Sequence, residues 1–112
     1  MIQIDLLNEN SIEIGANYNA TFQLCNSPDL TQYTGICQIR QSNVSTDIIL
    51  SPVVQILNKD TFNIKLLYSV YPNTIVAGNY VYDTLFSKID NTDRFYAVGG
   101  KIQIVKRVTK IV

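Results

Sequence analysis

The stretch that decides the fold is Phe62-Asn63-Ile64-Lys65-Leu66. In an extended chain successive side chains point to opposite faces, so the three apolar residues share one face and the two polar residues share the other. This alternation is typical of an antiparallel strand with one face on the core and the other in water. We therefore expect Phe62, Ile64 and Leu66 to be buried, and Asn63 and Lys65 to face solvent.

Comparable strand-forming runs occur along the whole sequence, separated by turn-forming Asn, Asp, Pro and Gly residues. The runs are Ile2–Leu6, Ser11–Ile14, Ala20–Cys25, Ile36–Gln41, Val53–Leu57, Thr61–Leu67, Asn79–Phe86 and Lys101–Val108. Short strands at a spacing of about ten residues favour a sandwich. The sequence therefore predicts an all-β, immunoglobulin-like antiparallel β-sandwich of seven to eight short strands, with one domain over residues 1–112 and a single helical turn within 69–77.

Residues that carry chemistry are scarce. The sequence has no histidine, which excludes Ser-His-Asp and Cys-His catalysis and most zinc sites. Residues 90–93 (Asp-Asn-Thr-Asp) offer oxygen ligands but lack the Gly and the closing Glu of a calcium loop, so they predict a hairpin turn. Asp83 lies inside a strand with no acid/base partner in the sequence. A glycine pair, Gly99 and Gly100, indicates a bulge. We expect no enzyme, cofactor or metal site.

The two cysteines fall on opposite faces of their strands. Cys37 alternates with Ile39 and should point inward, whereas Cys25 follows inward-facing Leu24 and should point outward. Side chains on opposite faces cannot reach the geometry of a disulfide, so we expect two free thiols. No signal peptide or membrane-length apolar run is recognised, which indicates a protein made in the cytoplasm and not secreted.

Charge is balanced overall but unevenly distributed. Nine basic and nine acidic side chains cancel, so the chain lacks the basic excess expected for binding nucleic acid or a membrane surface. All charged residues before Arg40 are acidic, and all charged residues after Asp93 are basic. Either the first and last strands are neighbours and share cross-strand pairs, or opposite-charge edges let identical copies meet head to tail. The candidate protein-contact residues are Asp5, Glu9, Glu13, Lys106, Arg107 and Lys110.

Three segments resemble, in order, immunoglobulin-like virion modules of tailed bacteriophages. Residues 29–35 (DLTQYTG) followed by 37–40 (CQIR) are similar to the first family segment, although Gln32 stands where the family usually has Gly. Residues 77–83 (AGNYVYD) and 94–104 (RFYAVGGKIQI) are similar to the next two strands. The family includes the N-terminal domain of baseplate upper proteins and small capsid decoration proteins.

This resemblance implies a structural protein of the virion, present in many copies on a symmetric lattice. Baseplate members carry a linker and a fibre after this domain and none follows here, so we expect an auxiliary capsid (decoration or cement) protein bound to the major capsid protein. Two alternatives are a tail or baseplate adaptor and a ligand- or glycan-binding module. The last is suggested by seven tyrosines, more than a core needs, some of which should be exposed.

Overall fold

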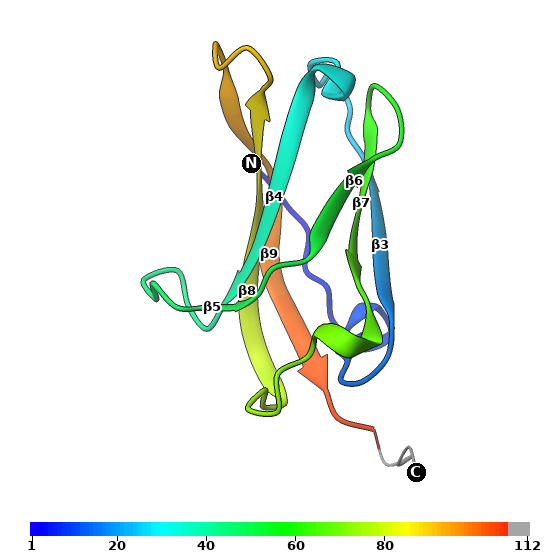
Figure 1. Ribbon diagram of the computed structural model, residues 1–112, viewed down its shortest axis with the longest axis vertical. Helices are drawn as coiled ribbons and strands as arrows, with labels where there is room; N and C mark the ends of the chain where they lie inside the picture. Colours follow the sequence, from blue (N-terminus) through cyan, green and yellow to red (C-terminus); the bar gives the residue numbers. More distant parts are fainter. Residues whose placement is uncertain (108–112) are drawn as a thin grey trace.

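The computed structural model describes residues 1–107, which form two β-sheets packed face to face (Figure 1). The strands are β1 (Ile2–Gln3), β2 (Ile12–Glu13), β3 (Tyr18–Gln23), β4 (Tyr33–Arg40), β5 (Ile48–Leu50), β6 (Val53–Ile56), β7 (Thr61–Leu66), β8 (Gly78–Lys88) and β9 (Arg94–Val105). Three short 3-10 helices are η1 (Asn8–Asn10), η2 (Leu30–Gln32) and η3 (Tyr68–Val70). The all-β class is confirmed. The single helical turn expected within 69–77 is present only in part, because η3 begins at Tyr68 and ends at Val70, and η1 and η2 were not predicted.

The strand order is that of an immunoglobulin-like sandwich. The larger sheet runs β1-β9-β8-β4-β5, with β2 also on β9, and the smaller sheet runs β3-β7-β6. In immunoglobulin terms β3, β6 and β7 correspond to strands B, D and E, while β4, β8 and β9 correspond to C, F and G. The strand pairs of the sandwich are antiparallel, as predicted, except that β1 and β2 pair with β9 in parallel. Strand β5 was not predicted.

The core follows the alternation seen in the sequence. Phe62, Ile64 and Leu66 are buried, and Lys65 is exposed. The Phe62 ring contacts Phe86 edge-on, with centroids 4.9 Å apart, and thereby joins β7 of one sheet to β8 of the other. Full burial of such a side chain contributes about 1.5–3 kcal/mol. Cys37 is buried and Cys25 exposed, and both thiols are free, as expected.

Asn63 departs from the pattern. It was expected to face solvent, yet only 5% of its surface is exposed, and within residues 1–107 its Oδ1 has no hydrogen-bond partner. Asn63 lies on the central strand of its sheet, opposite Thr21 on β3 and Gln55 on β6. Asn63 therefore has a strand on each side, a consequence of strand order that alternation cannot indicate.

Two glycines allow the N-terminal residues to lie against β9. Residues 2–14 run alongside this strand, and we call this contact the N-terminal seam. Backbone N–H groups of Ile4 and Leu6 donate to Gly99 O and Lys101 O at 3.0 and 2.8 Å. A Cβ on Gly100 would lie 2.8 Å from Ile4 O, too close for any side chain. The glycine pair is therefore needed for close backbone approach.

The predicted bulge lies beside the glycine pair rather than at it. The β8–β9 register shifts between Asp83 and Leu85, so that Ala97 and Val98 together face Thr84. The buried Thr84 hydroxyl accepts from Val98 N at 3.0 Å and donates to Val98 O at 2.9 Å. The sequence indicated Gly99 or Gly100 because glycine favours bulges, but here the Thr84 hydroxyl satisfies the displaced backbone instead.

Candidate functional site

Two of the predicted contact residues, Glu13 and Arg107, contact each other within the chain. Glu13 Oε1 lies 2.6 Å from Arg107 Nη2, on the exposed side of the N-terminal seam. This hydrogen-bonded ion pair lowers the pKa of the Glu13 carboxyl and raises the pKa of the Arg107 guanidinium. Cross-strand pairing between the first and last strands, one of the two interpretations of the charge distribution, is therefore confirmed for this pair.

The remaining contact residues have different environments. Asp5 Oδ1 accepts a hydrogen bond from the Lys101 backbone N–H at 3.0 Å, which lowers the pKa of the Asp5 carboxyl. Glu9 and Lys106 are exposed, and neither side chain has a hydrogen-bond or ion-pair partner within residues 1–107. Lys110 lies outside the described residues. Contact with another protein through this set stays a prediction.

The three acidic contact residues line one groove. It has a volume of about 650 Å³ and lies between residues 4–13 and strand β3 (Tyr18–Gln23). Among the described residues, its charged lining residues are Asp5, Glu9 and Glu13, and no lysine or arginine of residues 1–107 lines it. We call it the acidic groove. Its lining combines three carboxylates with residues of strand β3.

Strand β3 is an edge strand. It pairs with β7 on one side only, and in the order β3-β7-β6 none of the strands formed by residues 1–107 lies on the other side. Leu24 N donates to Asp60 O at 2.8 Å, continuing the β3–β7 ladder. Hydrogen-bonded and non-hydrogen-bonded pairs alternate along an antiparallel ladder. Asn19, Thr21 and Gln23 therefore turn their backbone N–H and C=O groups toward the acidic groove.

A second surface is apolar and lies at the opposite edge of the same sheet. Ile48, Val53, Leu67 and Val70, which we call the apolar patch, are 48%, 66%, 61% and 49% exposed. They line a groove of about 660 Å³ formed by β5, β6, the end of β7 and η3. Since β6 and β3 are the two edges of the smaller sheet, the patch and the acidic groove flank β7 on opposite sides. Exposed apolar groups gathered in this way are typical of contact sites.

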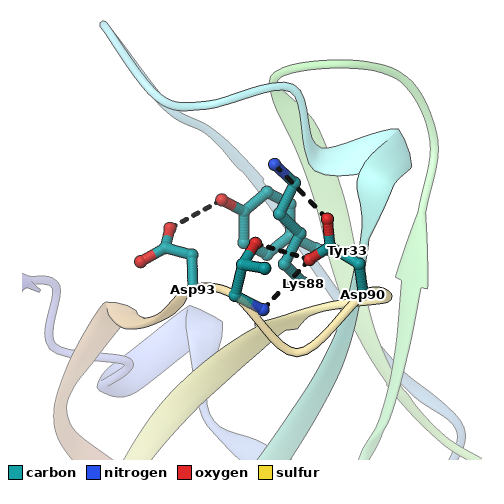
Figure 2. A network of polar contacts seen from close by, with 5 residues as sticks. Tyr33, Lys88, Asp90 and Asp93 are labelled. Atoms are coloured by element: carbon teal, nitrogen blue, oxygen red, sulfur yellow. Dashed lines mark hydrogen bonds and ion pairs between the residues drawn. The ribbon is translucent and has the colours of Figure 1, made fainter.

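The two carboxylates of the hairpin at residues 89–93 bind other groups of the same chain (Figure 2). Asp90 Oδ1 accepts from Thr92 N at 3.0 Å, and Lys88 Nζ lies 4.0 Å from Asp90 Oδ2. The Tyr33 hydroxyl donates to Asp93 Oδ2 at 2.7 Å, which raises the pKa of Tyr33 to about 12. The predicted hairpin turn is confirmed. Within residues 1–107 no three acidic or cysteine side chains gather as a metal site would require.

The tyrosines divide into two groups. Five donate their hydroxyls to acceptors inside the chain, namely Tyr18, Tyr33, Tyr71, Tyr80 and Tyr82. Tyr68 and Tyr96 are 65% and 54% exposed, which confirms that some lie at the surface. Tyr68 belongs to η3 and Tyr96 to β9. No helix among the described residues has the length and apolarity to cross a membrane.

Comparisons with known proteins add little. No family model and no curated protein matches the chain. Among solved structures, it is similar to a putative glycoside hydrolase from Bacteroides vulgatus, with a TM-score of 0.48 and 12% sequence identity. The match covers 87% of this chain and 16% of that one, so this chain spans a small part of that protein's length.

Proposed function

We propose that this chain is a non-enzymatic structural subunit of a tailed-phage virion, specifically an auxiliary capsid protein that decorates or cements the major capsid lattice. The observation that carries the proposal is the pair of contact surfaces at opposite edges of the smaller sheet. The acidic groove lies along β3, and the apolar patch lies beside β6. A subunit that bridges neighbours on a lattice needs two such surfaces.

The segments that resemble the phage family make framework contacts here. Residues 33–40, 78–83 and 94–104 belong to the adjacent strands β4, β8 and β9. Within them, the hydroxyls of Tyr80 and Tyr82 donate to Val76 O and Ile4 O, both at 2.6 Å. The resemblance therefore supports a shared scaffold, on which the contact surfaces are the variable part.

Size favours binding through many weak contacts. A standard interface takes about 800 Å² per partner, whereas the whole chain exposes 7378 Å². Each subunit can therefore make two or three contacts of modest area. Repetition on a lattice converts such contacts into high occupancy, because each bound neighbour raises the effective concentration for the next.

Immunogold labelling of purified particles tests the proposal. Antibody against this chain should decorate the head, and quantitative mass spectrometry should find it in a fixed ratio to the major capsid protein. Labelling confined to the tail would replace this proposal with the tail or baseplate adaptor. Absence from particles, together with saturable binding to glycans, would favour the ligand-binding module instead.

A matched pair of variants tests the apolar patch. Val53→Glu places a charge in the patch, whereas Val44→Glu places one on a loop valine that is 90% exposed and lines neither groove. We expect particles to lose most of the bound Val53→Glu protein and to keep Val44→Glu at wild-type occupancy. Equal occupancy of both variants would show that the patch is not the lattice contact.

A further inference from the structure

We propose that the acidic groove accepts an added β-strand, and that this strand is residues 108–112 of a second copy of the chain. Copies would then join head to tail, the C-terminal segment of one along β3 of the next. This inference goes beyond the proposed function, because it concerns contacts between copies of this chain and needs no capsid.

The backbone of β3 is ready to receive a strand. Asn19, Thr21 and Gln23 direct N–H and C=O groups to the open side, and within residues 1–107 these groups have no hydrogen-bond partner. Immunoglobulin strand A occupies this position in the sheet that contains strands B, E and D. Here the N-terminal residues instead run along β9 in the other sheet. An extended segment added to such an edge satisfies the backbone groups directly.

Charge and length select the occupant. The acidic groove carries three carboxylates, of which Glu9 has no partner within residues 1–107, and its lining includes no basic residue. Residues 108–112, which follow Arg107 of the seam, read Val-Thr-Lys-Ile-Val, with one cation, no acid and four β-branched residues. At about 3.3 Å per residue they span about 17 Å, which fits within the ~20 Å of the six residues of β3. We assign Lys110 of the incoming segment to Glu9.

The geometry favours a second copy over the chain's own segment. Ile14 N donates to Val105 O at 2.9 Å, and Arg107 is paired with Glu13, so the chain leaves β9 along the N-terminal seam and not along β3. Figure 1 shows β9 ending at the end of the sandwich where β3 begins, with the chain leading outward. To enter its own groove, the chain would have to reverse direction, and a tight reversal takes four residues.

Sedimentation of the purified full chain at increasing concentration tests the pairing of Lys110 with Glu9. Wild-type protein should associate reversibly, and Glu9→Lys or Lys110→Glu should each weaken association several-fold. An equal mixture of these two variants should associate again, because the groove of one now complements the segment of the other. Lys59→Glu, an exposed lysine outside the groove, is the matched control and should behave as wild type.

A second pair of variants tests the strand edge itself. Thr21→Pro removes an N–H that points to the open side and leaves the bonds to β7 in place, whereas Thr21→Val keeps the N–H and changes the side chain alone. We expect Thr21→Pro to stay folded by circular dichroism and to sediment as a monomer, with Thr21→Val associating normally. In wild type, the amides of Asn19, Thr21 and Gln23 should exchange more slowly as concentration rises.

Two results would overturn the inference. One is a wild-type chain that stays monomeric at millimolar concentration with unchanged exchange at these amides. The other is association that survives Thr21→Pro or is not restored in the mixture of charge variants. Because every measurement uses the isolated chain, neither result depends on whether the protein belongs to a capsid.

Discussion

The two ends of the N-terminal seam are held in different ways. At the first end, the backbone of Ile4 passes so close to Gly100 that a Cβ has no room, and the Tyr82 hydroxyl donates to Ile4 O. At the second end, Glu13 and Arg107 form an ion pair on the surface. Charge indicated in the sequence that these segments are neighbours. Exposed ion pairs contribute little, however, so close backbone packing should dominate the stability of the seam.

Among the substitutions that test this difference, Gly100→Ala should lower the free energy of unfolding the most. The new Cβ would lie 2.7 Å from Asp5 Oδ1 and 2.8 Å from Ile4 O, and a backbone atom cannot move aside as a flexible side chain can. We expect a loss of about 3 kcal/mol in the free energy of unfolding, measured with urea. Lys101→Ala, which keeps the backbone bonds, is the control. A Gly100→Ala protein as stable as wild type would show that the seam is loosely packed.

Thr84→Val should come next. The valine keeps the shape of threonine but leaves the buried N–H and C=O of Val98 without their partner. Val98 also pairs with Ile2 of the seam. Unsatisfied buried groups of this kind cost about 2 kcal/mol. Thr84→Ser retains the hydroxyl and should recover most of the loss in thermal unfolding. If valine and serine were equivalent, the hydroxyl would have no part in supporting the bulge.

Tyr82→Phe should have a smaller effect that depends on pH. Removing its hydrogen bond to Ile4 O should lower the free energy of unfolding by about 1 kcal/mol at pH 8. Burial raises the pKa of Tyr82. A raised folded-state pKa means that its contribution is complete below the unfolded value of about 10 and is lost as pH rises further. Between pH 8 and pH 11, the free energy of unfolding measured with urea should therefore fall less steeply for Tyr82→Phe than for wild type. Parallel curves would argue against a buried hydroxyl.

Glu13→Gln should have the smallest effect. The pKa of Glu13 is lowered by Arg107, so the contribution of the pair is present above the unfolded pKa and is lost as pH falls through the folded value. The unfolding temperature should match wild type closely at pH 7, and its decline toward pH 3 should be slightly shallower. Asp47→Asn, at an exposed acid outside the seam, is the control. A loss at pH 7 as large as that of Gly100→Ala would refute the comparison.

Most strands could be predicted because each has its own alternation, as in Phe22 and Leu24 around exposed Gln23. Strand β5 was missed because three residues, Ile48–Leu50, are too few to establish a period. Burial of Asn63 was also missed, since it depends on which strand is central in the sheet. Alternation indicates which face of the sheet a side chain lies on, but it does not indicate whether its strand has a neighbour on each side.

The acidic groove illustrates the same limit. Asp5, Glu9 and Glu13 were identified by charge, and the structure gathers them around one cavity. Their position along β3 could not be predicted, because an edge strand and a central strand can have the same residue pattern. The apolar patch was missed for a related reason. Its residues come from β5, β6 and the segment after β7, which are adjacent only once both sheets have formed.

The parallel seam also has a consequence in time. Asp5 and Lys101, which it joins, are 96 residues apart, so during synthesis residues 2–14 have no partner until β9 has been made. At about 5–20 residues per second, that interval is on the order of 5–20 seconds. During it Leu6 and Ile12, which are 5% and 0% exposed in the folded chain, lie uncovered beside unpaired backbone. Docking of the N-terminus must therefore be a late event in biosynthesis, and nascent chains released before Gly99 should be especially prone to aggregation.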